Sequence, residues 1–85
     1  MLVRLYTRPG CHLCDVARSV IEDERSRTPF ELEEIDVEAD DALELEYGIR
    51  IPVVTVDGEE AFEIEVDPGA FASLVGSAGT ETGTL

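Results

Sequence analysis

The spacing of apolar and polar residues changes several times along the chain, and each change predicts a different element. Residues 2–7 are short, β-rich and stopped by a Pro-Gly pair, which predicts a first strand. From Cys11 to Arg25 apolar residues recur every three or four positions, as on one face of a helix. Residues 30–37 predict a second strand, whose imperfect alternation leaves room for a bulge. A short helix is predicted from Asp40 to its end at Gly48.

The second half of the chain predicts a hairpin followed by a helix. Residues 53–56 are β-branched and fit a buried strand, and the Asp-Gly pair at 57–58 is a strong hairpin signal. Residues 60–66 alternate cleanly as the partner strand, and Asp67 with Pro68 predicts the start of a last helix. The expected apolar faces are Phe62, Ile64 and Val66 on the strand, and Phe71, Leu74 and Val75 on the helix.

The resulting order is β-α-β-α-β-β-α, which predicts an α/β fold. Strands one and two should be parallel because a helix connects them, and strands three and four should form an antiparallel hairpin. We therefore expect a four-stranded mixed sheet with helices on both faces. The 85 residues allow one domain, expected over 1–75, and the polar stretch 76–85 is expected to be a flexible C-terminal tail.

Charge and hydropathy exclude several classes of partner. The net charge is −14 and all six basic residues are arginine, so nucleic acid and anionic membranes are not expected partners. No apolar run approaches the roughly 20 residues that span a bilayer, and the start lacks a signal-peptide pattern, so we expect a cytoplasmic protein. Acidic excess without lysine also resembles proteins of salt-loving organisms, which predicts a melting temperature that rises steeply with salt.

The candidate chemistry lies in Cys11 and Cys14, the only cysteines of the chain. In a reducing cytosol such a pair is better interpreted as a redox or metal pair than as a permanent disulfide. Cys11 is expected at a helix N-terminus, where free N–H groups and the helix dipole lower the pKa of a thiol. Cys14, one turn later, should be more buried. We assign Cys11 as the nucleophile and Cys14 as the resolving thiol, with Arg8 as a nearby positive charge.

Three other interpretations stay open at this point. Cys14 could be a small buried core residue. The chain could instead be a non-catalytic binding module that keeps the fold and docks a partner at the exposed rim near Ile51. A zinc site would have only Cys11, Cys14 and His12 at hand, whereas structural zinc normally takes four ligands. A metal or cluster site shared between two chains therefore remains an alternative.

Two segments carry a resemblance to a known family. Residues 5–14, with Cys11-His12-Leu13-Cys14, resemble the active-site segment of glutaredoxin-like proteins, and residues 47–53 resemble the thioredoxin segment that carries a cis-proline. Over residues 1–75 the chain is similar to the small Cys-x-x-Cys glutaredoxin-like family. The resemblance implies a thioredoxin-like fold and thiol–disulfide exchange.

The resemblance also implies a substrate platform beside Cys11. Pro52 would be the cis-proline, its ring shielding the thiolate, and the backbone of Ile51 would pair with an incoming chain like an added strand. Arg8 lies where many glutaredoxins have a basic residue for glutathione. Asp67 could be a remnant of the acidic residues with which glutaredoxins hold the γ-glutamyl end of glutathione, besides its role as an N-cap.

The family's Gly-Gly signature for glutathione is replaced here by Val66-Asp67, which does not favour glutathione as the substrate. The expected partners are therefore a protein or low-molecular-weight disulfide, with an external reductase or small thiol as electron donor. Neither a metal nor an organic cofactor is needed for this chemistry, and the protein is expected to be a monomer.

Overall fold

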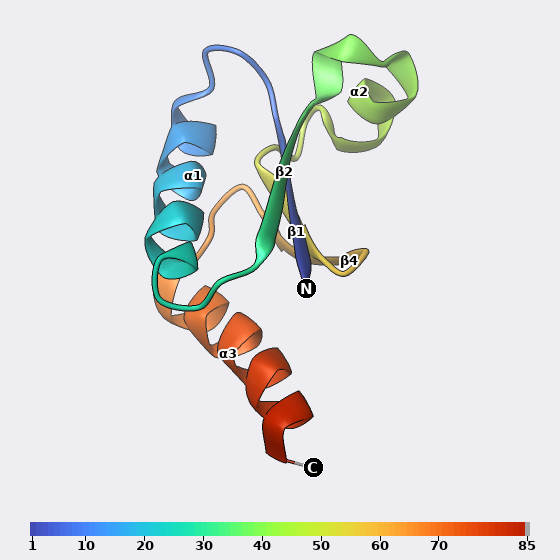
Figure 1. Cartoon of the computed structure of the whole chain (residues 1–85). Coiled ribbons are helices and arrows are strands. Elements are labelled where there is room, and N and C mark those ends of the chain that lie inside the picture. Colours follow the sequence, from blue (N-terminus) through green and yellow to red (C-terminus); the bar gives the residue numbers. More distant parts are fainter. Residues whose placement is uncertain (85) are drawn as a thin grey trace.

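The computed structural model describes the backbone of residues 1–84 and the side chains of residues 1–76. The elements follow the predicted order, with one added 3-10 turn, η1 (Figure 1). They are β1 (Leu2–Thr7), α1 (His12–Arg25), β2 (Glu31–Asp36), η1 (Val37–Ala39), α2 (Asp41–Tyr47), β3 (Val53–Val56), β4 (Glu59–Glu63) and α3 (Pro68–Thr84).

The strands form one mixed sheet in the order β2-β1-β3-β4. β1 is parallel to β2 and antiparallel to β3, so Tyr6 pairs with Ile35 on one side and with Val53 on the other. The C-terminal end of β1 and the N-terminal end of β3 therefore lie side by side, at the same end of the sheet. The segment that leads into α1 and the segment that leads into β3 are brought together there, although some forty residues separate them in the sequence.

Helices cover both faces of the sheet, as predicted. On one face, α1 and α3 pack on the larger core, whose buried residues are Val3, Leu5, Ala17, Ile21, Phe30, Val54, Val66, Phe71 and Val75. On the other face, Leu43 and Tyr47 of α2 pack with Tyr6, Val37 and Val53. None of the helices in the described backbone is long and apolar enough to cross a membrane.

The hairpin has the predicted turn but a shorter second strand. Asp57 and Gly58 both have positive φ, at 51° and 89°, as a tight hairpin turn requires. A register shift between Val54 and Thr55 bends the β3–β4 ladder, and β4 ends at Glu63. The predicted continuation to Val66 is wrong, because Ile64 has a φ of +70° and leaves the sheet.

Two further expectations need correction. The bulge suspected in the second strand is not found, since β1 and β2 pair continuously over six residues. Leu74 was expected to be buried with Phe71 and Val75, but it is 38% exposed while the other two are fully buried. The buried face of α3 is narrower than the spacing of its apolar residues predicted, because α3 contacts the sheet and α1 from one side only.

The predicted C-terminal tail overlaps the end of α3. The backbone of α3 continues through Gly76 to Thr84, so most of the stretch 76–85 is helical (Figure 1). Residue 85 lies outside the described residues. The expected flexibility of this stretch stays a prediction.

Candidate redox site

The two cysteines occupy unlike positions at the start of α1. Cys11 is the N-cap, with extended backbone angles, and is half-buried, whereas Cys14 lies in the first turn and is fully buried. Their sulfurs form a disulfide, with the Cα atoms 5.2 Å apart. Gly10, with a φ of +76°, makes the turn that brings the chain from β1 into this cap. The sequence predicted both positions, from the Pro-Gly stop after the first strand and from the helical spacing that follows.

Cys11 is held by the helix that it begins. The Cys14 N–H donates to Sγ of Cys11 at 3.1 Å, and the Asp15 N–H donates to the Cys11 carbonyl at 3.2 Å. An N-cap side chain that accepts from a free helix N–H is stabilised further when it is an anion. This arrangement favours the thiolate of Cys11 in the reduced protein, while Cys14 is shielded from solvent behind it.

The Ile51–Pro52 peptide bond is cis, which confirms the expectation drawn from the family resemblance. Pro52 is fully buried and directly precedes Val53, which pairs with Tyr6 near the end of β1. The half-buried Ile51 packs against the smaller core. This register places the cis-proline at the end of the sheet where β1 stops and the chain continues to Cys11.

Ile64 is a part of the site that the sequence did not reveal. Its N–H donates to the carbonyls of Pro52 at 2.8 Å and Arg50 at 3.2 Å, which ties the end of β4 to the cis-proline segment. The Glu65 N–H donates to the Glu63 carbonyl at 2.7 Å, closing a γ-turn around Ile64. A γ-turn with positive central φ is rare and strained, and more so for a β-branched residue. The alternation of residues 60–66 predicted instead that Ile64 shares an apolar strand face with Phe62 and Val66. It carried no signal of this turn.

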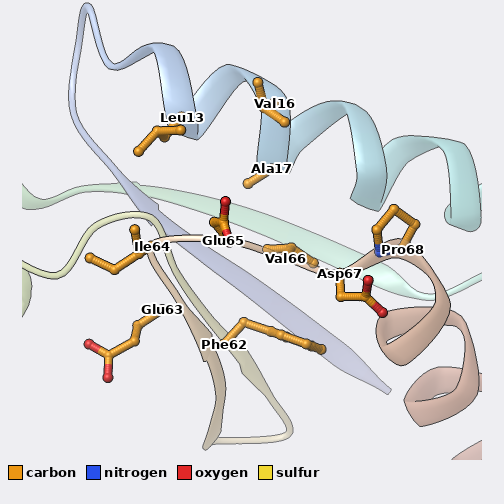
Figure 2. Close-up of a pocket in the computed structure, with 10 residues that line it drawn as sticks. All are labelled: Leu13, Val16, Ala17, Phe62, Glu63, Ile64, Glu65, Val66, Asp67 and Pro68. Atoms are coloured by element: carbon orange, nitrogen blue, oxygen red, sulfur yellow. The ribbon is translucent and has the colours of Figure 1, made fainter.

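A groove of about 480 Å³ lies between the first two turns of α1 and the segment that joins β4 to α3 (Figure 2). Leu13, Val16 and Ala17 line it from α1. The opposite wall consists of Phe62, Glu63, Ile64, Glu65, Val66, Asp67 and Pro68. Because Leu13 lies between the two cysteines in the sequence, one end of the groove is next to the cysteine pair, although neither cysteine lines it.

Asp67 is confirmed as the N-cap of α3. Its carboxylate accepts from the Ala70 N–H at 2.8 Å, and its carbonyl accepts from the Phe71 N–H. It also lines the groove, so the structure brings it to the same face as Leu13. A contact with substrate stays a prediction for Asp67, as it does for Ile51 and Pro52.

Arg8 is directed toward α2. Its guanidinium donates to the Gly48 carbonyl at 2.7 Å and lies 3.9 Å from the Glu38 carboxylate, and these are its described contacts. Gly48 ends α2 where the sequence predicted, with a right-handed φ of −51°. A Cβ there would lie 2.5 Å from the Glu44 carbonyl and 3.3 Å from the Arg8 guanidinium, so close packing explains the glycine. The substrate role of Arg8 stays a prediction.

Arg50, two residues before Pro52, forms ion pairs with the elements on either side of the cis-proline segment. Its guanidinium contacts the carboxylates of Glu60 at 2.7 Å, Glu46 at 3.4 Å and Glu63 at 3.8 Å. It also lies 5.4 Å from the centre of the Tyr47 ring. The hydrogen bond from Arg50 lowers the pKa of Glu60, and burial raises the pKa of Tyr47. This network joins α2 to β4 around the segment that leads to Pro52.

No group of three or more histidine, cysteine or acidic side chains is arranged to hold a metal ion among residues whose side chains are described. His12 is exposed in the first turn of α1. The cysteine pair is therefore the candidate reactive group at this end of the sheet.

The four-stranded sheet, its helices and the capped cysteine pair define a thioredoxin-like protein. The sequence profile of the glutaredoxin-like domain family (DUF836) matches residues 2–74, and the chain belongs to this family. An uncharacterized protein of Mycobacterium tuberculosis is 36% identical over 70 residues, which cover 76% of this chain and 72% of that protein.

Solved structures agree with this assignment. The X. campestris protein XcR50 superposes with a TM-score of 0.75 at 27% identity, over 88% of this chain and 96% of that one. A mutant thioredoxin from Halobacterium salinarum gives a TM-score of 0.63 at 28% identity, over 89% of this chain and 72% of that one. The fold and a close cysteine pair at its helix N-terminus are consistent with redox activity.

Proposed function

We propose that this protein is a thiol–disulfide oxidoreductase that exchanges electrons with protein or low-molecular-weight disulfides through Cys11 and Cys14. The observation that carries the proposal is the asymmetry of the pair. Cys11 is half-exposed and accepts a hydrogen bond at a helix N-terminus, whereas Cys14 is buried one turn later. An accessible, stabilised thiolate and a shielded second thiol are the two groups that disulfide exchange needs.

In the proposed reaction the Cys11 thiolate attacks one sulfur of the substrate disulfide. A mixed disulfide forms and the other substrate sulfur leaves as a thiolate. Cys14, deprotonated, then attacks Sγ of Cys11, which forms the Cys11–Cys14 disulfide and releases the second substrate thiolate. Two electrons have passed to the substrate, and an external reductase or small thiol restores the dithiol. This cycle suits a monomer in a reducing compartment such as the cytoplasm.

The test is reduction of insulin, or of a mixed-disulfide reporter, by the dithiol form. Cys11→Ser should abolish turnover, and Cys14→Ser should accumulate a covalent adduct that mass spectrometry detects. Ser19→Ala, at an exposed position of the same helix, serves as the matched control and should retain activity. Accumulation of the adduct in Cys11→Ser and not in Cys14→Ser would overturn the assignment of roles, and an inactive wild-type dithiol would overturn the function.

A further inference from the structure

The groove beside the disulfide leaves apolar side chains without partners. Leu13 and Val16 from α1 are 44% and 48% exposed, and Ile64 from the opposite wall is 42% exposed. These three residues lie around one concave surface instead of being scattered singly (Figure 2). Grouped apolar exposure in a groove is typical of a binding surface.

The charge of this groove has one sign. Glu63, Glu65 and Asp67 belong to its lining, which contains no basic residue. Figure 2 shows the Glu65 side chain in the gap between the two walls, with a carboxylate oxygen directed toward α1. Neither Glu65 nor Asp67 is ion-paired within the residues whose side chains are described. The Asp67 carboxylate caps α3 through the Ala70 N–H, whereas the Glu65 carboxylate faces the groove (Figure 2).

The arginines of the chain offset little of this charge. All six contact a carboxylate outside the groove, in pairs such as Arg18–Glu34, Arg25–Glu22 and Arg50–Glu60. Among the described ion pairs, only Arg50 also reaches a groove residue, Glu63 at 3.8 Å. The net charge of −14 adds a long-range field of the same sign. Anions are therefore repelled from the groove, and cations are drawn to it.

The groove is also connected to both halves of the redox site. Leu13 is the residue before Cys14, and Ile64 is hydrogen-bonded through its N–H to the Pro52 carbonyl. A polypeptide whose disulfide reaches Cys11 would have its neighbouring residues over Leu13, Ile64 and Glu65. The strained γ-turn at Ile64 turns that side chain out of the sheet and makes it one wall of the groove.

We propose that this groove selects the substrate class of the exchange reaction: polypeptide disulfides with an apolar side chain next to lysine or arginine. The apolar side chain packs between Leu13, Val16 and Ile64, and the cationic neighbour pairs with Glu65 and Asp67. Anionic disulfides, including glutathione disulfide, are disfavoured by the same charges. This inference rests on the proposed function for its chemistry, but the binding preference can be measured without turnover.

The binding experiment uses the oxidised protein and two fluorescein-labelled peptides in which serine replaces cysteine, so no exchange occurs. Both carry a central leucine, flanked by lysines in one peptide and by glutamates in the other. Fluorescence anisotropy at low salt should show at least tenfold tighter binding of the lysine peptide. The preference should shrink when salt rises, because screening weakens attraction between exposed charges. Affinities within twofold of each other would overturn the inference.

Matched variants locate the effect. Glu65→Gln should weaken binding of the lysine peptide about two- to fivefold, the range of a surface ion pair. Glu31→Gln removes the same charge from β2, the opposite edge of the sheet, and should change binding much less. Ile64→Gly should weaken binding of both peptides, whereas Leu45→Ala, at an 89% exposed position of α2, should not. Equal effects of Glu65→Gln and Glu31→Gln would show a general field without a selective groove, contradicting the proposal.

Turnover of disulfide-linked versions of the two peptides separates this inference from the proposed function. Faster reduction of the lysine version supports both. Equal rates for the two versions overturn the selectivity and leave the oxidoreductase intact. Tighter binding of the lysine peptide with no reduction of any disulfide overturns the oxidoreductase and leaves the groove as a cation-selective binding site.

Discussion

The positive φ of Ile64 predicts an inversion of the usual ranking of alanine and glycine. In a strand or helix, a glycine variant is less stable than the alanine variant by about 0.5–1 kcal/mol, because glycine loses more backbone freedom on folding. At a φ of +70° any residue with a Cβ instead incurs a left-handed penalty of about 1–2 kcal/mol. The second effect outweighs the first. Ile64→Gly should therefore be more stable than Ile64→Ala by about 0.5–1 kcal/mol.

Comparing two truncations with each other makes the prediction sharp. Both variants remove the branched part of the side chain beyond Cβ, so the burial that this part loses is the same in each and cancels in the difference. For a domain of this size the expected gap in melting temperature is about 2–8 °C. Thermal unfolding followed by far-UV circular dichroism, supported by urea titration, measures it.

Ile35 provides the matched control, because it lies inside β2 opposite Tyr6 in a regular ladder. There the ordinary ranking should hold, with the alanine variant more stable than the glycine variant. An Ile64→Ala variant as stable as Ile64→Gly, or more stable, would refute the reasoning. It would mean that the γ-turn does not impose a left-handed backbone in solution.

Three other perturbations follow from the packing. Gly48→Ala should lower the melting temperature by several degrees, because its Cβ meets the Glu44 carbonyl at 2.5 Å; an unchanged value would contradict the close packing. Phe71→Ala should cost about 3–5 kcal/mol of unfolding free energy in urea titration, since its fully buried ring packs edge-on against two other phenylalanines; a cost below about 1 kcal/mol would exclude it as an anchor of α3. Arg50→Gln should destabilise most above pH 4.5, the ordinary pKa of glutamate, because Arg50 lowers the pKa of Glu60 in the folded protein. The loss of melting temperature should vanish on acidification through the folded-state pKa, and a pH-independent loss would refute this linkage. Finally, the melting temperature of the wild type should climb steeply with salt, and a flat response would exclude self-repulsion as a limit on stability.

Much of the fold could be predicted because its signals are local. The bounds of β1 and β3 match the expected strands, and the Asp-Gly turn has the two positive φ angles that it requires. The unlike positions of Cys11 and Cys14 follow from helical spacing after a Pro-Gly stop. Each of these signals is a few residues long, and hydrogen bonding or steric preference within that window decides the outcome.

The rest of the candidate site depends on contacts between distant segments. Ile64 alternates correctly for a strand, yet its N–H bonds to the carbonyls of Arg50 and Pro52 and its backbone turns out of the sheet. Arg8 was expected near Cys11, three residues away, but its described contacts are with Gly48 and Glu38. No local pattern carries either outcome, because the competing partners lie 12 or more residues away.

By itself, the sequence determined the β-α-β-α-β-β-α order, the capped cysteine pair and the strongly acidic surface. These follow from periodicity, capping chemistry and composition, which are properties of short segments or of the whole chain. Only the tertiary structure decided that α1 and the β4–α3 segment enclose an acidic, apolar-lined groove at the disulfide. The reason is geometric: a groove exists only once the sheet register has placed the two walls opposite each other.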